Sequence, residues 1–91
     1  MPKLYDFLGL KIYFWTSDGS EPIHVHVSRG KPSPSSTKIW LTSRGGCAVA
    51  KDTGELTRRE LSLVCDFIVS EHAEICAAWA EKLRSEVRFY C

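Results

Sequence analysis

The sequence has no apolar run of the roughly 18 residues that a membrane-spanning helix requires. Its N-terminus also lacks the basic segment followed by an apolar segment that marks a signal peptide. Cysteine pairs with CxxC spacing are absent too, and the four cysteines fit reduced thiols better than a disulfide framework. These absences lead us to expect a cytoplasmic protein without a membrane partner.

A strong charge of one sign is lacking as well. The formal net charge is only +1, which argues against a dedicated nucleic-acid-binding protein. The sequence contains no Gly-rich phosphate loop, no paired carboxylate motif and no arrangement of cysteine and histidine that indicates a nucleophile. We therefore expect a binding protein rather than an enzyme, and we expect no cofactor.

The chain has 91 residues, the size of one domain, so we predict a single domain over residues 1–91. A chain of this size buries only somewhat more than ~60% of the surface that it exposes when unfolded. Its core is therefore modest, and we expect association with a protein partner or a second copy to add stability.

Residues 18–28 carry the one constellation with evident chemistry. A turn containing Asp18 and Pro22 leads into a strand in which His24 and His26 alternate with β-branched residues. Successive side chains of a strand point to opposite faces of the sheet. The two imidazoles are therefore predicted to lie side by side on one face.

Alternation of apolar and polar residues predicts four strands, at residues 10–16, 23–28, 37–42 and 47–51. Residues 1–9 are expected to drape over the domain. The prolines, glycine and serines of residues 29–36 predict a loop, and residues 87–91 are predicted to return as a short strand.

Two helices are predicted after the strands. Thr57 and Glu60 have the spacing of a capping box, which predicts a helix that begins after Thr57 and ends near Ser70. Residues 71–84 follow as a second helix or as a kinked continuation of the first.

Strands that precede helices indicate an α+β domain, an antiparallel β-meander of about four strands with one face covered by a C-terminal helical pair. The apolar residues of the strands, Val49 among them, would face the helices. The opposite face would be left uncovered and would display Tyr13, Trp15, His24, His26, Lys38 and Trp40. Exposed aromatic patches usually mark an interface, so we predict that this face, with Asp18 at its entry, binds a partner.

At these residues the sequence resembles the bacterial domain-of-unknown-function four-one-six-zero family. The resemblance rests on Gly9 and the following strand, the segment Asp18…Pro22-x-His24-x-His26-Val27, Gly54, the helix from Thr57, and the residues His72, Ile75 and Trp79. It implies a prokaryotic cytosolic protein without an established activity, often linked by gene neighbourhood to toxin–antitoxin-like pairs. The sequence departs from the family pattern at Gly19, where a histidine is commoner, and at Glu21, where a proline is commoner.

A metal site is one interpretation of the two histidines. His24 and His26 can donate two nitrogens to Zn²⁺ or another transition metal, but a site needs three or four ligands. Asp18, His72 or a cysteine would have to complete it, and Gly19 removes the candidate that a histidine would supply there. We favour the simpler interpretation, a pair of surface imidazoles bonded to the turn or to a neighbouring subunit, with no metal.

Two enzymatic interpretations also stay open. One imidazole could act as a general acid–base in a metal-independent ribonuclease, with Arg29, Lys31 or Lys38 holding phosphate. The segment also resembles part of a histidine-triad hydrolase motif, which needs a further histidine where Ser28 stands.

The sequence therefore favours a non-enzymatic binding module that uses its His/aromatic sheet face for a protein partner or for self-association, in a toxin–antitoxin-like pair. The alternative is a histidine-dependent ribonuclease-like toxin or a metal-dependent hydrolase that uses His24 and His26 as its catalytic candidates. Nucleic acid as a partner is not supported by the net charge.

Overall fold

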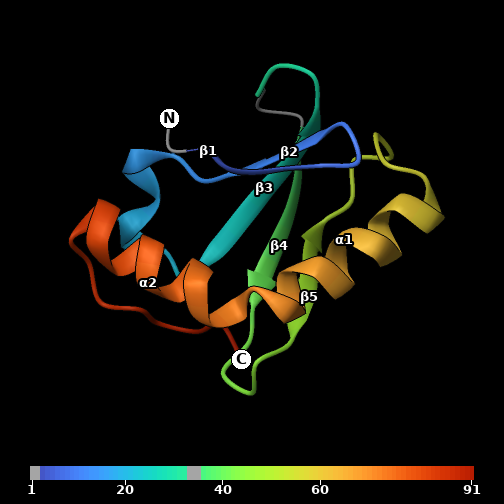
Figure 1. Cartoon of the computed structure of the whole chain (residues 1–91). Coiled ribbons are helices and arrows are strands. Elements are labelled where there is room, and N and C mark those ends of the chain that lie inside the picture. The colour runs from blue at the N-terminus through green and yellow to red at the C-terminus, as the bar shows by residue number, and fades with distance from the viewer. Residues whose placement is uncertain (1–2, 33–35) are drawn as a thin grey trace.

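The computed structural model describes residues 3–32 and 36–91, and residues 33–35 of the predicted loop lie outside them, as do residues 1–2 of the predicted lead-in. The described chain forms one antiparallel sheet with the strand order β1-β2-β3-β4-β5, followed by two helices (Figure 1). The strands are β1 (Lys3–Phe7), β2 (Leu10–Tyr13), β3 (His24–Arg29), β4 (Thr37–Leu41) and β5 (Cys47–Lys51). The predicted α+β class and the helical pair are confirmed, with five strands rather than about four.

The additional strand is β1, where the sequence predicted only a draped segment. It pairs antiparallel with β2, and Phe7 lies opposite Leu10. The connection is the dipeptide Leu8-Gly9, and both of its residues have positive φ, 53° and 77°. A two-residue hairpin turn of this kind normally takes Asn-Gly or Asp-Gly. With leucine at its first position the usual sequence signal is missing, so the sequence did not predict the hairpin.

The helices begin and end close to the predicted boundaries. Helix α1 (Arg58–Ser70) starts with the predicted capping box, in which Glu60 N–H donates to Thr57 Oγ1 (3.1 Å) and Thr57 N–H donates to Glu60 Oε1 (2.9 Å). Helix α2 (His72–Leu83) is separate from α1, because the intervening Glu71 has non-helical backbone angles. Neither helix is long and apolar enough to cross a membrane, which holds for the whole part of the chain that the structure describes.

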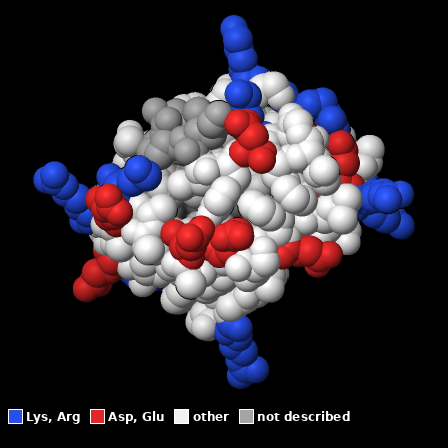
Figure 2. Space-filling model, in the orientation of Figure 1, with Lys and Arg blue, Asp and Glu red and all other residues white. Residues whose placement is uncertain are grey.

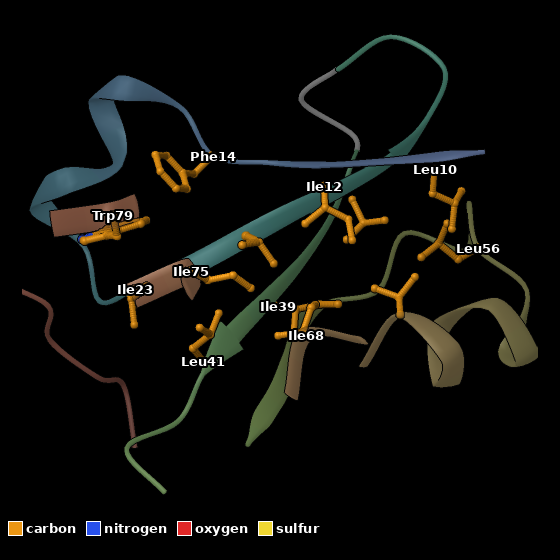
Figure 3. Close-up of a cluster of buried hydrophobic side chains, with 13 residues drawn as sticks. Leu10, Ile12, Phe14, Ile23, Ile39, Leu41, Leu56, Ile68, Ile75 and Trp79 are labelled. Atoms are coloured by element: carbon orange, nitrogen blue, oxygen red, sulfur yellow. The ribbon is translucent and has the colours of Figure 1, made fainter. Parts of the chain in front are cut away.

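The core lies between the helices and one face of the sheet, as predicted. Alternate residues of β2, β3 and β4 are fully buried against Val64, Ile68, Ile75 and Trp79 of the helices. Figure 3 shows these side chains filling the space between the two layers. Val49 is the exception to the predicted core, with 42% of its surface exposed, because it lies on the edge strand β5.

The prediction that the opposite face is uncovered is wrong. Tyr13 and His24 are fully buried, and the His26 side chain is only 14% exposed. Strand β2 ends at Tyr13, short of the predicted residue 16, and Thr16 joins residues 17–20 of the predicted turn in a 3₁₀-helix, η1 (Thr16–Ser20). This helix places the buried Asp18 against the two imidazoles. The chain after α2 brings Tyr90 onto Trp40, with ring centroids 4.9 Å apart and planes 6° from parallel.

Residues 84–91 form no strand, in contrast to the prediction for residues 87–91. Arg84 adopts a left-handed conformation (φ 49°), which ends α2 and redirects the chain. The segment then follows the ends of β3 and β4 through isolated backbone bonds from Ile23 N–H to Arg88 O (2.7 Å) and from Ser43 N–H to Cys91 O (2.9 Å). In Figure 1 this segment is the dark red chain that runs from α2 to the C-terminus.

Candidate metal centre

Strand β3 supplies the two histidines of the site, His24 at its first position and His26 at its third. His24 and His26 project from the same face of the sheet, and their ring centroids are 4.9 Å apart. In the strand register His24 lies opposite Trp40, while His26 lies opposite both Tyr13 and Lys38. The predicted alternation of β3 is therefore confirmed, and it brings both imidazoles to one place.

Asp18 reaches the same place from η1. Its Oδ2 accepts a hydrogen bond from the backbone N–H of Trp15 (2.8 Å), so the side chain folds back over the start of its own helix. The same oxygen lies 3.2 Å from Nε2 of His24 and 3.2 Å from Nε2 of His26. The sequence predicted Asp18 as a third candidate, and the structure brings it together with both histidines.

The Asp18 oxygen has more nitrogen neighbours than it has lone pairs. A carboxylate oxygen accepts about two hydrogen bonds. The N–H of Trp15 occupies one lone pair of Asp18 Oδ2. Only one of the two imidazoles can therefore donate to the remaining lone pair. His26 makes a hydrogen bond of acceptable direction to this oxygen, whereas His24 lies at the same distance without one.

The protonation of His24 follows from its other ring nitrogen. Nδ1 lies 2.9 Å from the carbonyl oxygen of Pro22, and a carbonyl can only accept, so Nδ1 carries the proton. A neutral His24 then has its lone pair on Nε2, which faces Asp18. This atom is fully buried and has no hydrogen-bond partner among the described residues. A buried lone pair that faces a carboxylate lacks a positive partner.

His26 is partly buried between Asp18 and Ser36, whose Oγ lies 3.4 Å from Nδ1. Burial lowers the pKa of His26, a positive charge on His24 would lower it further, and the Asp18 carboxylate opposes both effects. The neutral imidazole is therefore favoured near neutral pH. In one tautomer Nδ1–H donates to Ser36 and the Nε2 lone pair faces Asp18; in the other, Nε2–H donates to Asp18 and Nδ1 accepts from Ser36.

The three side chains have the donor types of a metal site, and both nitrogen-to-oxygen separations fit one. One ligand atom from each of Asp18, His24 and His26 lies within 4.8 Å of the other two. Two donors that each lie about 2.0–2.1 Å from a tetrahedral Zn²⁺ are separated by about 3.3 Å. The two nitrogen-to-oxygen distances of 3.2 Å match that separation. The Nδ1–H bond from His24 to a backbone carbonyl is the usual support for a metal-bound imidazole.

The remaining residues of the predicted binding face have partners of their own. Lys38 donates to Glu21 (2.7 Å) and also lies over the ring of Trp40, 4.4 Å from its centroid. The ring of Trp15 packs edge-on against Tyr13. Lys38, Trp15 and Trp40 are partly exposed. Their role in binding a partner stays a prediction.

Arg29, one of the three expected phosphate contacts, and the third histidine bond to other parts of the molecule. Arg29 pairs with the carboxylate of Glu60 at the start of α1. His72 donates from Nε2 to the carbonyl of Thr42 (2.8 Å), which ties α2 to the end of β4. On the face shown in Figure 2, lysine and arginine side chains project separately, with acidic side chains between them.

Reasoning from the sequence missed Ser36 and the role of the Pro22 carbonyl. Ser36 belongs to a stretch that the sequence describes only as a Pro/Ser-rich loop, so nothing predicts its position beside His26. The carbonyl of Pro22 contacts a side chain two residues away, and this depends on the exact path of the chain between η1 and β3.

A model of the family Domain of unknown function (DUF4160) matches residues 9–80. The chain belongs to this family. The match confirms the resemblance drawn from the sequence, and it includes Asp18, His24 and His26, while residues 84–91 lie beyond it. No curated protein and no solved structure matches the chain. The family description names no activity, so the geometry of the site carries the functional argument.

Proposed function

We propose that the protein binds one divalent transition metal ion between Asp18, His24 and His26. The observation that carries the proposal is the buried Nε2 of His24, whose lone pair is fixed by the bond from Nδ1 to Pro22 and faces a carboxylate without a partner. A bound cation would be coordinated by this lone pair and by the lone pair of His26, and it would neutralise the negative charge of Asp18. Two imidazoles with one carboxylate suit Zn²⁺, and the same set is used for Fe²⁺.

Protonation of His24 is the competing way to complete the cluster. An imidazolium would donate from Nε2 toward Asp18, but it would place a charge on a side chain with no exposure. Burial of a charge is costly unless the pair has excellent geometry. Nε2 of His24 lies 3.2 Å from Oδ2 of Asp18 but makes no hydrogen bond to it, so an ion pair between them would lack that geometry. The metal explains the arrangement without this cost.

A second candidate is hydrolysis by a Ser-His-Asp arrangement of Ser36, His26 and Asp18. Ser36 Oγ lies 3.4 Å from His26 Nδ1, and His26 Nε2 lies 3.2 Å from Asp18 Oδ2. This hypothesis requires the His26 tautomer that donates to Asp18. It leaves the lone pair of His24 unexplained, and Ser36 has only 3% of its surface exposed. No cavity for a substrate adjoins the cluster in the described part of the chain. The geometry therefore supports binding of an ion better than attack by this serine.

Three protein donors leave one tetrahedral position for an outside ligand such as water, which is the donor count of catalytic zinc sites. The side chains of Asp18 and His26 retain 10% and 14% exposure, whereas His24 is fully buried. An outside ligand would reach the ion on their side. A partner protein of the toxin–antitoxin type would have to approach this same side to regulate the ion.

Metal analysis of tag-free protein tests the proposal, because an affinity tag of histidines would bind metal itself. The wild type is expected to retain one ion per chain after dialysis against Zn²⁺, and the Co²⁺ form is expected to show ligand-field absorption. Asp18→Asn and His26→Gln should both lose the ion while circular dichroism shows a folded chain. His72→Gln is the matched control, since His72 is the third histidine and bonds to Thr42 instead. A wild type that binds no ion, or an Asp18→Asn variant that binds as the wild type does, would contradict the proposal.

A further inference from the structure

Asp18 lies in a short element, the 3₁₀-helix η1. Helix η1 has five residues, and backbone bonds join Asp18 to its two caps, from Asp18 N–H to Trp15 O (3.0 Å) and from Glu21 N–H to Asp18 O (3.0 Å). Single turns of 3₁₀-helix have poor hydrogen-bond geometry and little stability alone. Contacts from outside the turn therefore have to hold Asp18 toward the histidines.

Two side chains of the C-terminal segment provide such contacts. Ser85 Oγ donates to the carbonyl of Gly19 (3.0 Å), and Arg88 Nη2 donates to the carbonyl of Ser20 (2.8 Å). These two carbonyls belong to the two residues that follow Asp18 directly. The segment thus bonds to η1 beside the ligand and does not contact the cluster through these bonds.

The same segment is fastened to the sheet at the other end of the site. The backbone N–H of Ile23, the residue before His24, donates to Arg88 O (2.7 Å). Further along, the ring of Tyr90 stacks on that of Trp40, which is the cross-strand neighbour of His24. Residues 84–91 therefore hold the chain on both sides of the Asp18-to-His24 connection. Figure 1 shows this segment leaving α2 beside η1 and running along the end of the sheet.

We infer that residues 84–91 act as a strap whose Ser85 and Arg88 are positioning residues for the metal ligand Asp18. The inference rests on the proposed metal site. It adds residues 84–91, which lie beyond the family match at residues 9–80, as a determinant of the affinity for the metal ion. Metal affinity depends on donors that are held in place before the ion binds. Loss of the partners that orient a ligand typically weakens metal binding by about 10- to 100-fold.

The test compares Zn²⁺ dissociation constants, measured by competition with a chromophoric chelator, in full-length chains. Ser85→Ala/Arg88→Ala is expected to bind Zn²⁺ at least about tenfold more weakly than the wild type. Arg88→Lys, which keeps a donor for the Ser20 carbonyl, is expected to recover part of this loss. Arg44→Ala, at an exposed arginine between β4 and β5, is the control for loss of an arginine and should bind as the wild type does.

Two further readouts separate positioning from general stabilisation. The urea unfolding curve in chelator shows whether each variant is folded under the conditions of the titration, and the Co²⁺ spectrum reports the ligand geometry directly. A double variant that is folded and less stable but has the wild-type dissociation constant and Co²⁺ spectrum would overturn the strap while leaving the metal site intact. A wild type that binds no Zn²⁺ would instead overturn the proposed function.

Discussion

Zinc should raise the thermal stability of this protein by an amount that can be worked out, and Asp18→Asn should abolish the increase. A ligand that binds only the folded state stabilises it by about 2.7 kcal/mol when its free concentration is 100 times the dissociation constant. For a domain of this size each kcal/mol raises the melting temperature by about 4–8 °C. The wild type is therefore expected to melt roughly 10–20 °C higher in Zn²⁺ than in chelator.

Asp18→Asn keeps the shape of the side chain and an oxygen that can accept from Trp15 N–H, but it removes the negative charge. A neutral acceptor is worth roughly 1 kcal/mol less than a charged one, so the metal-free variant should be only slightly less stable than the wild type. Its melting temperature should not respond to Zn²⁺. Both forms are compared by differential scanning calorimetry with and without the ion.

The control for this experiment is His72→Gln, which alters a histidine that bonds to the Thr42 carbonyl. This variant should be less stable in chelator and should still gain the full increase from Zn²⁺. The reasoning is refuted if Zn²⁺ raises the melting temperature of Asp18→Asn as much as that of the wild type. Equal increases would place the ion elsewhere on the chain.

Other regions of the molecule give further predictions. Thr57→Ala removes the side-chain half of the capping box and should lower the free energy of unfolding in urea by about 1 kcal/mol, with Thr57→Ser close to the wild type. Alkylation at pH 8, followed by mass spectrometry, should modify the exposed Cys91 first and Cys65 last, because burial raises the pKa of the Cys65 thiol to about 12. Early modification of Cys65 would show that α1 opens readily. Ser36→Ala should weaken Zn²⁺ binding by about tenfold through its contact with His26; complete loss of a measurable esterase activity in this variant would favour the serine hydrolase hypothesis instead.

The strands and helices that the sequence predicted are those whose signals are local. The alternation in β3 and β4 depends only on which face each residue buries, and the structure buries the expected face. The start of α1 depends on a reciprocal bond between Thr57 and Glu60, three residues apart. In both cases the interacting residues are near neighbours in the chain, so the sequence contains the whole pattern.

The features that the sequence did not predict depend on contacts between distant residues. His24 is buried beside Asp18 of η1 and the rings of Trp40 and Trp79, and the C-terminal segment bonds to η1 through Ser85 and Arg88. These bonds join residues 66 and 68 positions apart. The residues concerned are polar and have no periodicity that would reveal the pairing. The sequence therefore predicted an open sheet face, whereas Tyr13 and His24 on this face are buried.

The structure also changes the significance of Gly19. The resemblance drawn from the sequence led us to expect a histidine here, and its absence to remove a metal ligand. A Cβ atom at Gly19 would lie 3.6 Å from Cβ of Ser85 and 3.7 Å from Cβ of Leu83. A side chain there would begin against the end of α2 and the strap, whereas Asp18 points toward the histidines. Both distances are ordinary van der Waals separations, so the strap packs against η1 at the place where a side chain of residue 19 would begin. The groups that would hold the proposed ion are all present in this chain: a carboxylate at Asp18, the imidazole of His24 with its tautomer fixed by the carbonyl of Pro22, and a second imidazole two residues further along the strand.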